Sequence, residues 1–353
     1  MAVAHLVKNT EPNDDFNLEP DEEKFRKFVK FGLEAIIRSL NSGTIEDRTE
    51  RHRNLEKALR TSPITRDENA ANAQHYEVPA AFFQTVLGPH LKYSACYFRS
   101  PESSLAEAEE AALEQVCSRA QLYDGQQVLD LGCGWGATSL FVAERFPASR
   151  VVALSNSIGQ RRFIEAEAIR RGLSNLSVIT ASVSEVEFET PFDRIVSIEM
   201  MEHVRNWPAL LTRMRDWLVP DGLAFVHVFS HREHGYLFDG IDVTAQHYFT
   251  GGFMPSDRLI YCFCNALRVA DHWAFDGTHY ARTARNWLER LEANQELVLS
   301  IFADAADACT ARNDYHHWRN FFALVEESFG FRNGNEWIVS QYLLTPREEG
   351  AIQ

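Results

Sequence analysis

The sequence predicts an α/β protein with a mostly parallel sheet and helices on both faces. Two observations carry this prediction. Between residues 127 and 229, short apolar runs alternate with helical stretches, and such alternation produces parallel strands joined by crossover helices. One of these runs, residues 127–131, leads directly into three alternating glycines and a helix, an arrangement typical of sheets that bind a ligand at their strand ends.

Composition narrows the class of protein. The chain has 353 residues, 45% hydrophobic and 24% charged, which fits one large globular domain with elaborations or two domains. The net charge of −15 argues against nucleic-acid binding, which depends on neutralising phosphates, and is compatible with a small cationic substrate. The six cysteines include no CxxC pair, no apolar run approaches roughly 18 residues, and no apolar leader opens the chain. We therefore expect a cytoplasmic protein without integral membrane contact.

The N-terminal part of the sequence is expected to form a tail followed by helices. We expect residues 1–20 to form a flexible acidic tail and residues 21–122 a helical extension or cap. Apolar residues between 21 and 40 recur at i, i+3 and i+4, which predicts an amphipathic helix. Such a helix docks on its own protein, covers a substrate or contacts a second copy, so a homodimer is among the expected partners. A second helix is expected over 46–60.

The segment 123–230 carries the strand–helix alternation and is the predicted cofactor-binding core. A helix over 105–122 precedes it. The expected strands are 127–131, 150–154, 176–179, 192–198 and 223–229, and the expected helices are 137–145, 160–171 and 208–218. Strands are short apolar runs and helices are amphipathic with a period near 3.6, so the two patterns can be told apart.

The remaining chain divides into a lid and a C-terminal part. Residues 231–266 are aromatic, irregular and too long for a simple connection, and insertions of this kind usually cover an active site. We expect residues 267–353 to complete the sheet and to add helices. The expected strands there are 267–273 and 337–344, and the expected helices are 282–302 and 314–329.

The clearest motif is the run 128–137, Val-Leu-Asp-Leu-Gly-Cys-Gly-Trp-Gly-Ala. Gly132 permits the tight turn, and Gly134 lets a ligand approach the backbone. A nicotinamide dinucleotide site uses similar glycines, but Asp130 would repel its pyrophosphate and no acid ends the second strand. Asp130 can instead receive an ammonium group, so the loop resembles the S-adenosylmethionine loop of class I methyltransferases.

Four motifs occur in order along the chain: residues 75–79 (His-Tyr-Glu-Val-Pro), 93–98 (Tyr-Ser-Ala-Cys-Tyr-Phe), 130–136 and 198–203 (Ile-Glu-Met-Met-Glu-His). Together they resemble the cyclopropane fatty acid synthase superfamily over roughly residues 70–345. The likeness is closest to its amine-methylating branch, the coclaurine and related alkaloid N-methyltransferases. This resemblance implies a class I methyltransferase fold, S-adenosylmethionine as cofactor and an aromatic or alkaloid-like amine as substrate.

The resemblance also implies cofactor contacts, position by position. The implied residues are Tyr93, Ser94, Gly132, Gly134, Asn156 and Gln160. Gln160 would serve the ribose in place of the missing acid. The family usually has an Ala-Asp pair after the third strand that reaches the adenine amino group. Here the pair is Ala181-Ser182, so Ser182 would provide the acceptor.

Glu199, Glu202 and His203 follow the strand 192–198, where ligands bind in open α/β sheets. If these residues turn helical, they share one face. Methyl transfer to nitrogen needs a free lone pair, yet an amine of pKa about 10 is neutral in only about one part in 10³ at pH 7, a cost of about 4 kcal/mol. We predict that His203, oriented by Glu202, acts as the base and that Glu199 holds or deprotonates the ammonium. The alternative is a set of capping charges at a helix start.

A lipid-modifying enzyme is the main competing interpretation. Cyclopropane synthases of this superfamily hold a bicarbonate ion, and Glu202 and His227 match that site. Ala95, however, replaces the family's cysteine, and Leu288 stands where a tyrosine is usual. His227 lies in an apolar strand, so a core role is as open as a catalytic one. A catalytically inactive binding protein is a third class, against which the intact Glu and His residues argue.

The substrate pocket is less defined by the sequence. Its candidates are His227, Tyr248, Phe249 and Tyr280, and the aromatic residues Phe253, Tyr261, Phe263 and Trp273 either join the pocket or pack in the core. His231 and His234, or the pair His316 and His317, lack a third ligand at metal spacing, so we expect no metal. We predict an S-adenosylmethionine-dependent N-methyltransferase acting on a small amine, with lipid modification as the alternative.

Overall fold

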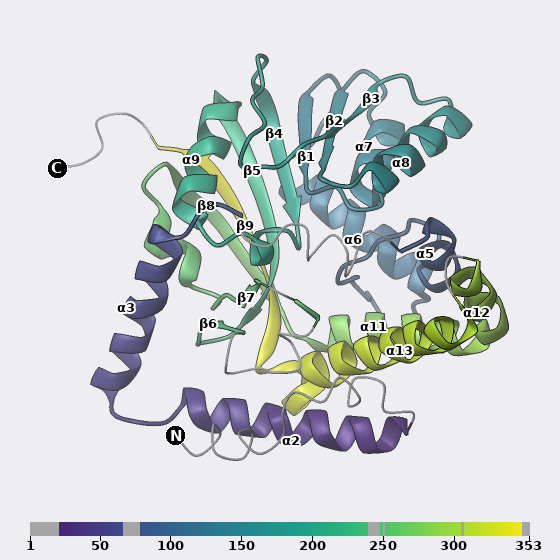
Figure 1. The fold of residues 1–353 in the computed structure, drawn as a ribbon. Coiled ribbons are helices and arrows are strands. Elements are labelled where there is room, and N and C mark those ends of the chain that lie inside the picture. The colour runs from purple at the N-terminus through teal and green to yellow at the C-terminus, as the bar shows by residue number, and fades with distance from the viewer. Residues whose placement is uncertain (1–20, 66–77, 239–247, 250, 305–306, 348–353) are drawn as a thin grey trace.

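The computed structural model describes residues 21–65, 78–238, 248–249, 251–304 and 307–347. Within them a seven-stranded sheet has the order β3-β2-β1-β4-β5-β9-β8 (Figure 1). The strands are β1 (Gln127–Leu131), β2 (Arg150–Ser155), β3 (Leu176–Thr180), β4 (Phe192–Ile198), β5 (Leu218–His231), β8 (Leu267–Phe275) and β9 (Trp337–Pro346). The first five pair in parallel, and β9 lies antiparallel between β5 and β8. The predicted fold class is confirmed.

Helices cover both faces because the strands alternate their apolar side chains. They are α6 (Leu105–Arg119), α7 (Ala137–Arg145), α8 (Ile158–Arg171) and α9 (Trp207–Trp217). Leu129 and Val226 join the core on the α9 side, whereas Val128 packs with α6 and α7 residues and Phe225 with Val116 of α6. Successive strand residues point to opposite faces, and burying each large apolar side chain contributes about 1.5–3 kcal/mol.

The N-terminal helices dock on their own protein. The buried face of α2 (Glu22–Leu40) lies along α13 (Ala308–Gly330), and Arg26 pairs with Glu326 at 2.7 Å and with Glu327 at 2.8 Å (Figure 1). In contrast, α3 (Ile45–Thr61) packs against α9 at another part of the molecule. The predicted tail, residues 1–20, lies outside the described residues, and the domain boundaries at 122, 230 and 266 stay predictions.

One helix that precedes the sheet in the chain and three helices that follow β8 form a helical layer. It comprises α5 (Ala80–Val86), α11 (Thr278–Ala293), α12 (Gln295–Ala303) and α13, and Figure 1 shows the last three side by side. The single helix expected over 282–302 is wrong in one respect, because it breaks at Asn294 into α11 and α12. In the expected lid, β6 (Tyr236–Leu237) pairs with β7 (Phe253–Met254) and is followed by η3 (Leu259–Phe263). Residues 239–247 and 250 lie outside the described part.

Candidate active site

The glycine loop follows β1 as the sequence predicts. Gly132 has φ +82°, and a Cβ there would collide with the Met200 side chain. Gly134 has φ +52°, and no heavy atom lies within 4 Å of the position that its Cβ would take. Gly132 is therefore required by backbone conformation and by packing, whereas the space at Gly134 stays open for a ligand.

Asp130 lies in β1, just before the loop. It is 2% exposed, and it accepts a hydrogen bond from the Ser139 hydroxyl at the start of α7. Burial raises the pKa of Asp130 to about 6, partly opposed by the Ser139 hydrogen bonds. Near neutral pH it is mostly a buried carboxylate, and no cationic side chain of the described residues forms an ion pair with it, so it is a suitable acceptor for an ammonium group.

Polar groups at the ends of β2 and β3 surround the loop. Ser155 Oγ donates to Gln160 Oε1 at 2.6 Å, and the neighbouring Asn156 is exposed. Within the described part of the chain, Gln160 Nε2 and Trp135 Nε1 are buried donors without an acceptor. Ser182 Oγ accepts the Ser184 backbone N–H at 3.1 Å. A ligand carrying a carboxylate and ribose hydroxyls would supply acceptors here, so these residues fit S-adenosylmethionine.

The Tyr93-Ser94 segment is organised by two buried charges that the sequence did not mark. Lys92 is 1% exposed, and its Nζ donates to Ser94 Oγ at 2.7 Å and to the Ala95 carbonyl at 2.6 Å. Glu109 of α6 is fully buried and accepts three backbone N–H groups of this loop. Burial raises the pKa of Glu109 to about 7. The sequence could not mark Lys92 and Glu109, because a single charged residue outside a periodic pattern or motif does not indicate burial.

Glu199 lies at the centre of the site, directly after β4. Its carboxylate accepts hydrogen bonds from Ala95 N at 2.8 Å, from the Tyr280 hydroxyl at 2.7 Å and from His227 Nε2 at 3.2 Å. Burial opposes ionisation, yet the His227 hydrogen bond, aided by the charge of Lys92, holds the pKa of Glu199 below its usual value. Its backbone is left-handed, with φ +47°, an uncommon conformation for Glu.

Glu202 and His203 belong to a 3-10 turn, Met201–His203, rather than to the α-helical face expected from their spacing. That expectation is wrong because Glu199 precedes the turn in a left-handed conformation. Glu202 Oε1 accepts the Phe229 backbone N–H at 2.7 Å, and Glu202 Oε2 is buried without a partner among the described residues. Burial, and then the nearby Glu199, raise the pKa of Glu202 well above its usual value.

His203 has the opposite shift. Burial lowers its pKa to about 4, so its imidazole is neutral at pH 7. Its ring centroid lies 5.7 Å from that of Phe249. The structure therefore brings Glu199, Glu202 and His203 into one region. Glu199 prefers the ionised form, Glu202 the protonated form and His203 the neutral imidazole. The orientation of His203 by Glu202 stays a prediction.

The aromatic residues near 231–273 divide into two groups. Phe249 lies beside His203 and Phe229, and Tyr248 lies 4.8 Å from His317, ring to ring. The other group has different partners: Phe253 and Phe263 pack on Trp207, Tyr261 is 43% exposed and Trp273 lies under Arg119. Of the two open readings, core packing is the one that the contacts of Phe253 and Phe263 support.

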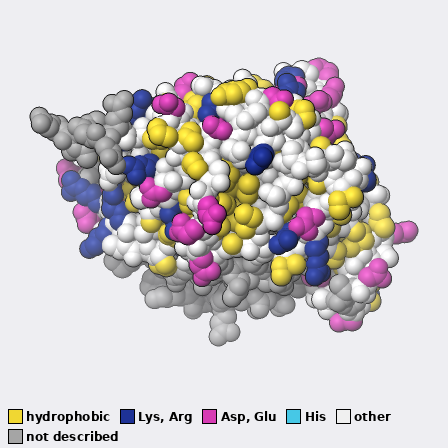
Figure 2. Space-filling model, turned by 90° about the horizontal axis from the view of Figure 1, so that it is seen from above, with side chains coloured by type: hydrophobic (Ala, Val, Ile, Leu, Met, Phe, Trp, Pro, Cys, Tyr) yellow, Lys and Arg dark blue, Asp and Glu magenta, His cyan; other side chains and the backbone are white. Residues whose placement is uncertain are grey.

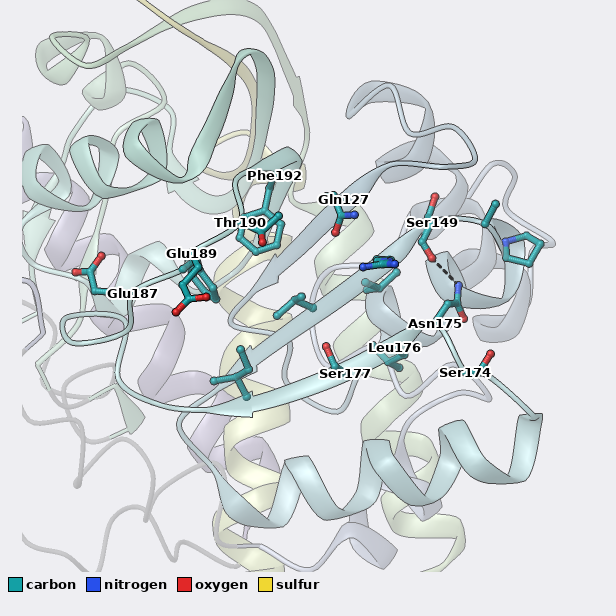
Figure 3. A pocket seen from close by; sticks show the side chains of 17 residues that line it. Gln127, Ser149, Ser174, Asn175, Leu176, Ser177, Glu187, Glu189, Thr190 and Phe192 are labelled. Carbon is teal, nitrogen blue, oxygen red and sulfur yellow. Dashed lines mark hydrogen bonds between the residues drawn. The ribbon is translucent and has the colours of Figure 1, made fainter.

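A separate hollow of about 780 Å³ opens at the other edge of the sheet (Figure 3). It is lined at the amino ends of three strands by Gln127, Arg150 and Leu176, and by residues 187–190 of the β3–β4 connection. Asn175 donates to the Ser149 carbonyl there at 3.1 Å. No residue predicted for cofactor or substrate lines this hollow. Parallel sheets bind ligands at their carboxyl ends, so it is not the active site.

Ligand atoms of His52, Glu56 and Cys262 come within 4.8 Å of one another at the contact of α3 with η3. The sequence showed no metal spacing there because these elements are far apart in the chain. His52 and Glu56 already pair with each other at 3.0 Å, and Arg60 donates to the Cys262 carbonyl at 2.6 Å. With a guanidinium so near, this cluster is no basis for a metal site.

Comparisons with known proteins agree with this geometry. Residues 64–335 match the family model described as mycolic acid cyclopropane synthetase. The chain belongs to this family. It is 36% identical to (S)-coclaurine N-methyltransferase of Thalictrum flavum subsp. glaucum over 97% of this chain and 95% of that protein. The crystal structure of a coclaurine N-methyltransferase bound to N-methylheliamine and SAH superposes with TM-score 0.89 at 32% identity, covering 98% of this chain and 100% of that one.

A lipid-modifying relative is more distant. The cyclopropane-fatty-acyl-phospholipid synthase of Escherichia coli K12 is 27% identical over 76% of this chain and 67% of that protein. The predicted family and fold are therefore confirmed, and so is the prediction of an S-adenosylmethionine-dependent N-methyltransferase. Cyclopropanation is the less supported alternative.

The surface adds two observations. None of the helices in the described ranges is both long and apolar enough to cross a bilayer. Figure 2 shows acidic and basic side chains interspersed on the face seen from above. That mixture is typical of a solvated surface and differs from the basic patches that bind nucleic acid.

Proposed function

We propose that the chain methylates the nitrogen of a small ring-bearing amine that enters as an ammonium ion. The observation that carries this proposal is Glu199, a buried carboxylate whose pKa is lowered, beside Glu202, a buried carboxyl whose pKa is raised. Paired groups whose environments separate their pKa values indicate distinct acid–base roles. The names of the relatives support an alkaloid-like amine, because coclaurine N-methyltransferases are among them.

The charge of Glu199 would attract the ammonium, since a buried anion has a strong preference for a cationic partner. The proton then has to leave before nitrogen can attack. Because its pKa is raised, Glu202 first has to release its own proton to solvent; its carboxylate then takes the ammonium proton and becomes a carboxyl again, and in its ionised form it is a stronger base than His203. In this respect the proposal departs from the assignment of His203 as the principal base. His203, neutral and adjacent, would pass the proton or accept a hydrogen bond from the amine.

S-adenosylmethionine supplies the methyl group as an electrophilic sulfonium. Asp130 would hold its ammonium group, Gln160 its ribose, and the open side of Gly134 its backbone contact. The neutral amine forms an N–CH₃ bond as the S–CH₃ bond breaks, and the nitrogen becomes positively charged. Glu199 stabilises that charge as it forms, which is electrostatic catalysis in a buried site.

The contacts of Glu199 argue against the lipid alternative. Its carboxylate already uses the Ala95 N–H, the His227 imidazole and the Tyr280 hydroxyl. The Tyr280 hydroxyl therefore donates to a side-chain carboxylate. With a carboxylate occupying these donors, a second anion such as bicarbonate would be repelled. An alkene chain beside Glu199 would offer the buried carboxylate no cationic partner, whereas an ammonium ion would.

The deciding experiment supplies methyl-labelled S-adenosylmethionine together with cationic cyclic amines or with vesicles of unsaturated phospholipid. Mass spectrometry should find labelled N-methyl amine that does not depend on bicarbonate. Labelled cyclopropane or methyl-branched lipid, stimulated by bicarbonate, would contradict the proposal.

The compartment and the homodimer remain proposals as well. All six cysteines are free, which supports a reducing cytoplasm. Phe31 on the outer side of α2 is 60% exposed, which supports a contact with a second copy. Light scattering of the purified chain would test the oligomeric state.

A further inference from the structure

A chain of hydrogen bonds runs from helix α6 to Glu199 through His227, a residue that the sequence singles out, and Gln341, which no sequence motif marks. In the sheet register, His227 of β5 lies opposite Gln341 of β9. Gln341 Nε2 lies 3.0 Å from His227 Nδ1, and His227 Nε2 lies 3.2 Å from Glu199 Oε1. At the other end, Arg119 of α6 donates to Gln341 Oε1.

The chemistry of each partner fixes the direction of these bonds. A guanidinium has only donors, so the group of Gln341 that faces Arg119 is its oxygen. The amide nitrogen of Gln341 then points to His227 Nδ1 and donates to it. A neutral imidazole whose Nδ1 accepts carries its proton on Nε2, and this N–H donates to Glu199.

Packing holds Gln341 in this orientation. Gln341 is 1% exposed, and its Nε2 also donates to Gln115 Oε1 at 3.1 Å, one turn of α6 before Arg119. The Arg119 guanidinium lies 4.8 Å from the Trp273 ring, on the strand next to β9. A flip of the amide would place its N–H₂ against a cation and break bonds that water cannot replace in a buried site.

The imidazole is neutral, so its tautomer decides what Glu199 receives. Burial lowers the pKa of His227, and the charges of Lys92 and Arg119 lower it further, although Glu199 opposes them. With the other tautomer, His227 Nε2 would present a lone pair to a carboxylate, and the two acceptors would repel each other. Glu199 would then lose one of its donors and turn away or take up a proton.

We propose that Gln341, oriented by Arg119, is a positioning residue that fixes His227 in the Nε2–H tautomer and so keeps Glu199 ionised and turned toward the substrate ammonium. This inference rests on the proposed function only for the role of the ammonium. The tautomer itself is a property of the protein without substrate.

The test compares three variants of the full chain. Gln341→Met removes the donor with little change in length, and Gln341→Glu replaces the donor by an acceptor. Tyr342→Phe is the matched control, because it removes a buried hydrogen bond of the same strand, from the Tyr342 hydroxyl to the Asp257 carbonyl at 2.8 Å. Tyr342 belongs to the core on the α9 side, away from His227.

Imidazole ¹⁵N spectra, with His227→Gln as the assignment reference, give the first readout. Wild type and Tyr342→Phe should show His227 protonated on Nε2 only, whereas Gln341→Glu should show a proton on Nδ1.

Steady-state kinetics give the second readout. The KM for a cationic amine should rise about tenfold in both Gln341 variants, the order of one lost hydrogen bond to a charged group, and by less than about twofold in Tyr342→Phe.

The outcomes separate the inference from the proposed function. An unchanged His227 tautomer in Gln341→Glu, or an equal rise of KM in Tyr342→Phe, would overturn the inference whatever the substrate is. A changed tautomer in an enzyme that methylates lipid rather than amine would leave the inference about the tautomer intact and refute the proposed function. Should Gln341→Glu fail to fold, the tautomer and KM of Gln341→Met decide.

Discussion

The carboxyl side chains at the two ends of the parallel strands differ in burial and in pKa. At the carboxyl edge, Asp130, Glu199 and Glu202 are buried, with pKa values raised, lowered and raised. At the amino edge, Glu187 and Glu189 stand exposed beside the hollow of Figure 3. Burial costs a charged group several kcal/mol unless a partner compensates it, so buried carboxyls are retained where a ligand supplies the partner. This difference in burial supports the carboxyl ends of the strands as the place of the chemistry, independently of any related protein.

The largest effect should come from removing the proton acceptor. We expect Glu202→Gln to lower kcat by about 10²–10⁴, the range for lost acid–base catalysis, with little change in cofactor affinity. The loss should shrink at high pH, because more of the amine is then neutral. Initial rates between pH 7 and 9 measure both effects. Glu187→Gln, an exposed carboxylate of the amino edge, is the control and should keep wild-type rates. Wild-type turnover in Glu202→Gln would remove its catalytic assignment.

Removing the buried anion should act on binding. Glu199→Gln keeps the shape but loses the charge, so KM for a cationic amine should rise about 10–100-fold, the order expected for a charge-assisted hydrogen bond. Kinetics with the same amine at several concentrations check this. Equal KM values in wild type and variant would show that the site does not bind the ammonium through Glu199.

Blocking the glycine loop should abolish stabilisation by the cofactor. S-adenosylmethionine at about 100 times its Kd should stabilise the wild type by about 2.7 kcal/mol, and this gain should vanish in Gly134→Ala. Gly172→Ala is a matched control, because Gly172 also has positive φ, +70°, and open space around its Cβ position, but caps α8 away from the loop. Thermal unfolding with and without the cofactor separates the two. A retained shift in Gly134→Ala would contradict the assignment of the loop.

The smallest effect concerns pH. Because the pKa of Asp130 in the free protein is about 6, its carboxylate is ionised above that pH and increasingly protonated below it. The affinity for S-adenosylmethionine should therefore fall as the pH drops from 7 to 5, approaching tenfold per unit below 6. Calorimetric titration measures this. Asp130→Asn should bind weakly at every pH and lose the dependence. A pH-independent affinity in the wild type would show that Asp130 does not pair with the ammonium group.

The sequence by itself determined the order of strands and helices, because apolar periodicity and glycine turns are local signals. It also predicted the glycine loop after β1 and the cluster after β4, because parallel strands bring their carboxyl ends together. It could not mark Lys92, Glu109 or Gln341, since a single polar residue in an apolar segment has no periodicity. Nor could it predict that Glu199 and Glu202 do not share a helical face, because this follows from the left-handed backbone conformation of Glu199.

Only the tertiary structure decided what Glu199 contacts. Its three donors are Ala95 in the loop before α6, His227 in β5 and Tyr280 in α11. Ala95 and Tyr280 each lie more than 80 residues from Glu199 in the sequence, and folding brings all three donors within about 3 Å of its carboxylate. The protonation preferences of Glu199, Glu202 and His203 arise in the same way, because they depend on burial and on neighbouring charges rather than on residue type. Residue types therefore predicted which groups form the candidate site, and the folded environment set the protonation preference of each.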